Sequence, residues 1–172
     1  SCKSLHPFNE TAFWTVMGQA LNVFAEIVMK PVKIRIVSTV KDEKGKQQPS
    51  EQICFGSMAE KNGTNYVFYE ESEVTGLEGT KTTIKWNDER IIILRSGALD
   101  HRQEFCQGLV DKSLYQTPYM KIPLETATKY LYTGFRKGIW SLEIEYSLSH
   151  GGQPYGDMKI LIEIEEDTKG GH

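Results

Sequence analysis

The stretch KTTIKWNDERIIILRSGALDHRQEF, residues 81–105, decides the fold. Its β-branched and aromatic side chains suit a pleated, half-buried surface. Asn87 and Asp88 interrupt the pattern, and short Asx side chains of this kind favour tight turns. We therefore expect three consecutive antiparallel strands, with Gly97 separating the second strand from the third.

The turn length decides which residues of this hairpin face each other. A two-residue loop puts Thr80 opposite Arg95 and Thr82 opposite Ile93. Ile84 then faces Ile91, and alternation places Arg95 on the same face as these isoleucines. A longer loop would change the register. Because the isoleucine run is apolar on both faces, periodicity alone leaves the direction of Arg95 open.

Strand patterns continue through most of the chain. Val32–Lys41 alternates between apolar and polar residues, and Lys61-Asn62-Gly63-Thr64 is a strong hairpin signal. Further strands are expected over 51–60, 65–71, 113–117, 119–126, 128–133, 139–149 and 158–165. Eight to ten strands without interleaved helices predict an all-β fold, and closure into an antiparallel barrel removes exposed edges.

Residues 1–28 differ from the remainder. Thr11–Ala25 contains no charged residue, and its apolar residues recur at spacings of three and four, which predicts a helix. This segment is too short and too interrupted to span a membrane. It packs against the barrel, binds a partner or membrane surface, or is an upstream addition. The expected organisation is an extension over 1–28, a barrel over 29–167 and a tail over 168–172.

Composition limits the classes of function. The chain has 172 residues, 39% of them hydrophobic, and a formal net charge of −3, which suits one domain with a real core. A pI near 5.8 argues against a dedicated duplex-DNA binder. Cys2, Cys54 and Cys106 are widely spaced and form no CxxC pair. We expect reduced thiols in a cytoplasmic protein.

Several blocks of sequence resemble one known family. They are KPVKIRIVSTVKD (30–42), YVFYEE (66–71), KTTIKW (81–86), ILRSGALDHRQEF (93–105), TPYMKIPLETATKYL (117–131) and LEIEYSL (142–148). In these blocks the chain resembles the YwiB-like family of small bacterial β-barrel proteins, a domain-of-unknown-function group called DUF1934. The resemblance implies a closed, lipocalin- or calycin-like barrel and no particular activity. His101 stands where family members more often carry an apolar residue.

Arg95 is the strongest candidate for a functional residue. An arginine inside a small barrel needs a partner, since an isolated buried charge costs several kcal/mol. We expect Glu70 or Glu71 to pair with it, with Gln103 or Tyr146 nearby. The guanidinium either holds a ligand carboxylate or phosphate, or forms an internal salt bridge that fixes strand register. The predicted ligand site comprises Arg95, Arg102, Gln103, Glu71 and Tyr146.

Catalytic and metal-binding patterns are missing from the sequence. The four histidines are spread along the chain, Ser96 precedes Gly97 without a GxSxG motif, and Gly151-Gly152 lacks the lysine of a phosphate loop. We therefore expect no catalytic residues, no metal, no cofactor and no enzyme activity.

Two functions from different classes remain. The first is a binding module that holds a small anionic ligand in the barrel interior or mouth, although large side chains favour a filled interior. The second is an interaction protein that docks a protein or RNA partner through residues 1–28 or an exposed sheet face. The basic residues expected on such a face surround Trp86: Lys81, Lys85, Arg90, Arg95 and Arg102. The sequence leaves homo-oligomerisation open.

Overall fold

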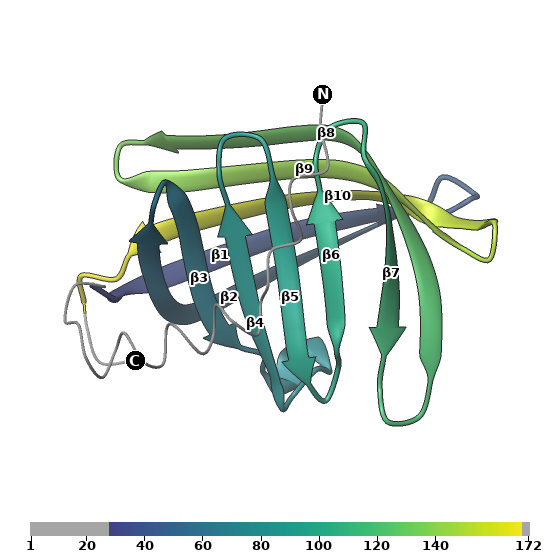
Figure 1. Cartoon of the computed structure of the whole chain (residues 1–172), viewed down its shortest axis with the longest axis horizontal. Coiled ribbons are helices and arrows are strands. Elements are labelled where there is room, and N and C mark those ends of the chain that lie inside the picture. Colours follow the sequence, from purple (N-terminus) through teal and green to yellow (C-terminus); the bar gives the residue numbers. More distant parts are fainter. Residues whose placement is uncertain (1–27, 170–172) are drawn as a thin grey trace.

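Ten antiparallel strands form one continuous sheet in the computed structural model, which describes residues 28–169 (Figure 1). Their order in the sheet is β6-β5-β4-β3-β2-β1-β10-β9-β8-β7. The strands are β1 (Lys30–Lys41), β2 (Gln47–Lys61), β3 (Thr64–Glu70), β4 (Thr80–Trp86), β5 (Ile91–Gly97), β6 (His101–Phe105), β7 (Val110–Gln116), β8 (Lys121–Arg136), β9 (Ile139–His150) and β10 (Gln153–Glu166).

The sheet folds over on itself to enclose a core. In Figure 1 the long strands β9, β10 and β1 run across the picture behind the shorter strands β3 to β6, which run from top to bottom. Inward-facing side chains of both halves meet between them, as in crossed sheet packing. The largest fully buried residues there include Trp86, Phe105, Ile34, Leu142 and Ile162.

Long strands turn the corners between the two halves. β2 pairs with β1 along residues 47–58 and with β3 only along residues 57–61. Gly56 lies at this change of partner, where an added Cβ would collide with the carbonyl oxygen of Phe68. β8 makes the second corner with a register shift between Thr128 and Tyr130. A bulge of this kind bends a strand locally.

The barrel is nearly closed. β6 and β7 stand at the two ends of the strand order, and one bridge joins them, in which Asp100 and Gln116 exchange backbone hydrogen bonds of 2.8 and 2.9 Å. Farther along, the Glu104 amide donates to Asp111 Oδ2 at 3.0 Å. Side chains therefore replace a backbone ladder at this seam, which corrects the prediction of a fully closed barrel.

The central hairpin has a longer turn than predicted. Asn87–Arg90 forms the loop, and Asn87 Oδ1 accepts hydrogen bonds of 2.9 Å from the Glu89 and Arg90 amides. Arg95 consequently pairs with Thr82 rather than Thr80. The shift is two residues, so every side chain keeps its predicted face although its predicted cross-strand partner is wrong.

Two further predictions need correction. Within residues 28–169 no α-helix occurs, and the helical turn η1 (Glu73–Thr75) is a short 3-10 helix, so the extra N-terminal helical segment is not supported. Residues 1–27 of that segment lie outside the described part of the chain. Cys54 is a free thiol and Cys106 is not, so the expectation of reduced thiols holds for Cys54 alone of these two.

The tight hairpin between β2 and β3 is confirmed. Lys61 pairs with Thr64, and the two residues between them, Asn62 and Gly63, have φ values of 52° and 78°. Both central residues of a type I′ turn need this left-handed region, which asparagine and glycine reach more easily than other residues.

Candidate functional site

Four side chains form a polar row across the inner face near one end of the barrel. Cross-strand pairing joins Tyr69 to Thr82, Thr82 to Arg95, and Arg95 to His101. Directly opposed residues of an antiparallel sheet have their Cβ atoms about 5 Å apart on the same face. The pairs therefore gather a phenol, a hydroxyl, a guanidinium and an imidazole from four neighbouring strands.

Glu71 brings a carboxylate to this row. Its backbone amide donates to the Thr80 carbonyl at 2.9 Å, which continues the strand geometry one residue beyond β3. Glu71 Oε1 accepts a hydrogen bond of 2.8 Å from Thr82 Oγ1, and Oε2 accepts one of 3.4 Å from Gln52 Nε2. Arg95 Nε lies 3.9 Å from Oε1. The carboxylate, only 3% exposed, is thus partnered on several sides.

Arg95 uses little of its bonding capacity. Its side chain is 23% exposed, so it reaches from the interior towards solvent. Within residues 28–169 it makes the ion pair with Glu71, and its buried Nε has no hydrogen-bond partner. A guanidinium carries five N–H donors in a fixed fork. Arg95 therefore has N–H donors for which no hydrogen bond is found within residues 28–169.

Two neighbours of Glu71, Tyr69 and Cys54, are neutral at ordinary pH. Burial raises the pKa of Tyr69 far above its usual range, and the charge of Glu71 raises it further. Burial, followed by the charge of Glu71, also raises the pKa of the Cys54 thiol to about 12. A thiol must ionise to act as a nucleophile, so Cys54 is an inert lining residue here.

His101 links the site to the seam of the barrel. Its Nε2 lies 2.9 Å from Ser113 Oγ, and its ring meets the Tyr115 ring edge-on at 5.5 Å between centroids. Burial lowers the pKa of His101 to about 4, with the charge of Arg95 acting in the same direction. The imidazole is therefore neutral near pH 7 and joins β6 to β7.

Two other predicted residues line the same interior. Gln103 is 6% exposed, and its Nε2 donates to Thr126 Oγ1 at 2.9 Å. Tyr146 is 5% exposed, and burial raises its pKa to about 12, although Arg95 and Gln103 both act to lower it. Of the five predicted residues, the structure therefore brings Arg95, Glu71, Gln103 and Tyr146 to the interior.

Arg102 is the exception. Arg95 pairs with His101 on the inner face. Arg102 follows His101 in β6, so it points to the outer face, where it pairs with Leu94. There its Nη1 lies 3.1 Å from Glu104 Oε2, while Arg90 Nη1 lies 2.6 Å from Glu104 Oε1. Arg102 cannot act together with Arg95 on one small ligand.

The expected basic and aromatic surface for RNA is also divided between two faces. Trp86 is 1% exposed and lies in the core, on the inner face with Arg95. Lys85 and Arg102 lie on the outer face. Stacking of a base on Trp86 beside these cations is therefore not available in this fold.

Sequence reasoning missed three polar residues of the site: Tyr69, Thr82 and Gln52. Tyr69 shares a face with Glu71 through two-residue spacing, which was a usable signal. Thr82 was hidden by the assumed two-residue loop, which placed it opposite Ile93. Gln52 reaches Glu71 from the adjacent strand β2, beyond the end of its pairing with β3, and nothing local in the sequence indicates such a contact.

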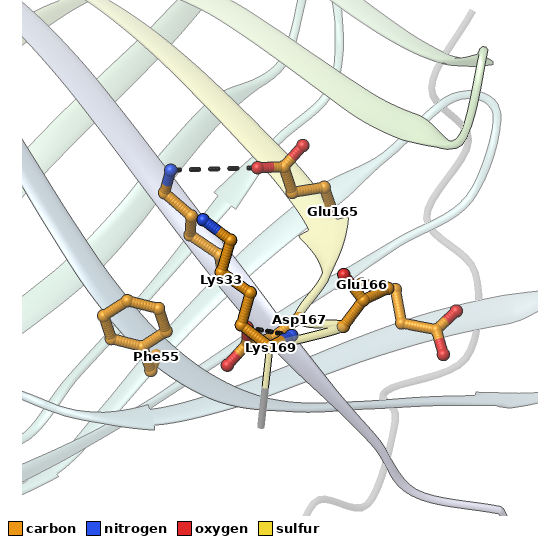
Figure 2. Close-up of a pocket in the computed structure, with 7 residues that line it drawn as sticks. Lys33, Phe55, Glu165, Glu166, Asp167 and Lys169 are labelled. Atoms are coloured by element: carbon orange, nitrogen blue, oxygen red, sulfur yellow. Dashed lines mark hydrogen bonds and ion pairs between the residues drawn. The ribbon is translucent and has the colours of Figure 1, made fainter. Parts of the chain in front are cut away.

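A groove lies on the outside of the barrel, away from Arg95. It has a volume of about 350 Å³ and is lined by Lys33, Phe55 and the chain from Glu165 to Lys169. Figure 2 shows Lys33 and Glu165 turned toward each other, with Lys33 Nζ 3.8 Å from Glu165 Oε1. The groove carries two lysines against three carboxylates, Glu165, Glu166 and Asp167, so it has no excess positive charge for an anion, and the Arg95 site is the stronger candidate.

Among residues 28–169, no three histidine, cysteine, aspartate or glutamate side chains are placed to hold a metal ion. The same part of the chain contains no helix long and apolar enough to cross a membrane.

The fold and this interior define a small, nearly closed antiparallel β-barrel with a charged pair at one mouth. The chain belongs to the DUF1934 family, a domain of unknown function whose family model matches residues 34–162. It is similar to the uncharacterised β-barrel protein YwiB of Bacillus subtilis (strain 168), with 24% identity over 138 residues, 80% of this chain and 95% of the relative.

The fold is also that of a solved structure. The crystal structure of the ywiB protein from Bacillus subtilis matches with a TM-score of 0.73 and 23% identity, over 83% of this chain and 96% of that one. The resemblance to the YwiB-like family predicted from sequence is thereby confirmed.

Proposed function

We propose that the protein binds a small carboxylate-bearing molecule at the barrel mouth through Arg95. The observation that carries this proposal is the state of the guanidinium: partly exposed, bonded to Glu71 by a single 3.9 Å contact, and otherwise without a hydrogen bond within residues 28–169. A planar fork in this state suits the two oxygens of a carboxylate.

The surroundings favour a ligand of low charge. Glu71 offsets the charge of Arg95, and the tyrosines and His101 beside them are neutral, so the site has no excess positive charge for a polyphosphate. The ring of Tyr115 against His101 adds an apolar wall. A monocarboxylate with an apolar body matches this combination of groups.

The position of the site favours the mouth over the interior. Deeper in the barrel, Trp86 and Phe105 are 1% and 0% exposed and fill the core with Ile84 and Ile93. An interior filled by side chains leaves no space for a ligand there, whereas Arg95, at the end of the barrel, is partly exposed. We therefore place the ligand's carboxylate on Arg95, with its apolar body directed along the mouth.

Thermal melting with a defined probe tests this function. Benzoate at 100 times its dissociation constant stabilises a binding protein by about 2.7 kcal/mol, which corresponds to roughly 5–10 °C for a chain of this size. We expect this shift in the wild type and its loss in Arg95→Ala. Arg102→Ala is the matched control, an arginine on the same strand pair but the opposite face, and should keep the shift.

Two results would remove the proposal. One is equal loss of the shift in both arginine variants. The other is the lack of a shift for every member of a series of aromatic and aliphatic monocarboxylates, together with native mass spectrometry that finds no small molecule retained by the purified chain.

A further inference from the structure

The second half of β8 has a strand partner on one side alone. β7 pairs with β8 along residues 121–127, and the last backbone hydrogen bonds on that side join Thr128 to Gly108 and Leu109, at 3.0 Å each. On the other side, β9 pairs with β8 as far as Arg136. Within residues 28–169 the segment 129–136 is therefore an open sheet edge, named here the β8 edge. Figure 1 shows β8 running along the top of the molecule, above β9.

The hairpin between β8 and β9 fixes which backbone groups face this edge. Lys137 and Gly138 form its two-residue turn, with φ values of 53° and 80°, so Arg136 and Ile139 are a hydrogen-bonded pair. Along an antiparallel strand, backbone groups point alternately to one neighbour and to the other. Three residues of the β8 edge therefore direct their N–H and C=O groups away from β9, and within residues 28–169 no backbone hydrogen bond satisfies these groups: Leu131, Thr133 and Phe135.

The side chains of the β8 edge leave it accessible. Tyr130 and Tyr132, on the outer face, are 41% and 47% exposed, and Phe135 is 60% exposed. Tyr132 lies along the strand over Gly134, where an added Cβ would collide with its hydroxyl group. An aromatic ring that covers a glycine in this way helps to keep the strand extended.

The chain protects another open edge but not this one. Within the described residues, the segment 47–56 of β2 pairs with β1 alone, and it contains Pro49, which has no N–H, and the exposed charge of Glu51. Proline and charge are usual defences of an edge strand. The segment YLYTGF, residues 130–135 of β8, has neither and is rich in residues that favour strands. Such an edge is a template for pairing with another strand.

Charges at its two ends disfavour pairing of the β8 edge with itself. Lys129 and Arg136 flank the six uncharged residues, and both are exposed. Antiparallel pairing of two copies in full register would place Lys129 of one opposite Arg136 of the other, and like charges directly opposite destabilise a sheet. Lys129 has Asp157 at 3.3 Å, whereas no ion pair within residues 28–169 involves Arg136 or Lys137. Uncompensated positive charge therefore lies at the hairpin end of the edge.

We propose that the β8 edge binds an extended peptide segment of another protein as an added strand, with an acidic residue of that segment beside Arg136 and Lys137. The free backbone groups of the edge hydrogen-bond the segment, and Tyr130 and Tyr132 contact its outward side chains. The acidic residue offsets the charge at the hairpin end. This interaction is separate from the ligand site at Arg95, which lies on β5.

Hydrogen exchange of the free chain tests whether the edge is open. The amides of Leu131, Thr133 and Phe135 should exchange at least tenfold faster than those of Tyr132 and Gly134, which point to β9. Equally slow exchange at all five amides would show that the edge is already paired and would overturn the proposal.

A defined peptide tests the partner. At saturation, acetyl-EVTVTVTE-amide should slow exchange of the three edge amides at least tenfold, and the lysine-ended acetyl-KVTVTVTK-amide should bind at least tenfold more weakly. Arg136→Glu should remove this preference. Lys121→Glu is the matched control, because Lys121 is an exposed charge on the part of β8 that pairs with β7, and it should leave the preference unchanged.

Three results would contradict this interaction. The first is lack of protection by the acidic peptide at its highest soluble concentration. The second is equal binding of the same peptide with its interior amides N-methylated, since that form cannot donate backbone hydrogen bonds. The third is protection that grows with the concentration of the chain alone, which would assign the edge to a second copy.

Discussion

Arg95 Nε lies 3.9 Å from Glu71 Oε1, and the same oxygen accepts a hydrogen bond from Thr82. The two charged residues come from β5 and from the end of β3, on either side of β4. Glu71 thus holds both Thr82 and Arg95, and the weak contact of Arg95 is the one that the proposed ligand would replace.

Removing the side chain of Glu71 should destabilise the fold more than removing that of Glu70. Glu71→Ala leaves Arg95 without its counter-charge and Thr82 without an acceptor, and we expect a loss of about 3 kcal/mol, at the lower end for a buried pair because Arg95 is partly solvated. Glu71→Gln should cost less because the amide oxygen still accepts from Thr82. Urea unfolding measures both.

Glu70→Ala is the control for this prediction. Glu70 is exposed and points to the opposite face, so its removal should change the free energy of unfolding by about 0.5 kcal/mol or less. Similar losses for Glu70 and Glu71 would show that the inward carboxylate has no special role.

His101 should make stability pH-dependent. Its pKa is about 4 in the folded chain, against 6.5 for an unperturbed histidine. Between these values the unfolded chain binds more protons, so the free energy of unfolding falls as pH drops from 6.5 towards 4, by up to about 3 kcal/mol. Denaturant midpoints measured across this pH window give the slope of stability against pH. The groups that face the imidazole are Arg95 and Tyr115.

Variants separate the contribution of His101 from that of the carboxylates, which also bind protons at low pH. His101→Gln should flatten the slope between pH 6.5 and 4. His150→Gln, at an exposed histidine, should leave it as in the wild type. A slope that survives in His101→Gln would assign the pH dependence to other groups.

Gly56 should tolerate no side chain. An alanine Cβ would collide with the Phe68 carbonyl oxygen and lie 3.0 Å from Tyr69 Cβ, so β2 and β3 would have to separate. We expect Gly56→Ala to lower the free energy of unfolding by about 2 kcal/mol or more. Thermal melts of both variants measure the loss. Ser57→Ala, at the adjacent half-buried position, is the control and should lower the free energy of unfolding clearly less.

The seam between β6 and β7 should open when Asp111 is lost. Asp111 Oδ2 accepts the Glu104 amide at 3.0 Å, and burial raises the pKa of Asp111. Asp111→Ala should speed hydrogen exchange of the Glu104 amide at least tenfold. Asp111→Asn keeps an acceptor oxygen and should restore most of the protection. Equal exchange in all three chains would show that the seam does not depend on this contact.

Which residues share a face could be predicted from sequence because alternation records it directly. Ile84, Ile93 and Arg95 share one face as expected, even though the loop is longer than predicted, since a two-residue shift preserves facing. That this face points inward was left open, because the isoleucine run is apolar on both faces. The identity of partners could not be predicted, because it depends on how Asn87 closes the turn. Thr82 was therefore missed as the bridge between Glu71 and Arg95.

The remaining errors concern contacts between distant segments. Arg102 was grouped with Arg95 by closeness in sequence, but pairing of Arg95 with His101 turns it outward. The barrel is closed between β6 and β7 by the single backbone bridge Asp100–Gln116, and no local sequence pattern predicts that only this bridge forms there. The apolar outer face of β5 was visible in the sequence, since Ile92 and Leu94 interrupt the alternation.

The most direct test of the account follows the guanidinium of Arg95 itself. In a ¹⁵N–¹H spectrum of the full chain, titration with benzoate should shift the Nε–Hε resonance of Arg95 in a saturable manner and leave that of Arg102 in place. A resonance of Arg95 that stays fixed while the chain remains folded would contradict the assignment of the barrel mouth as a carboxylate site.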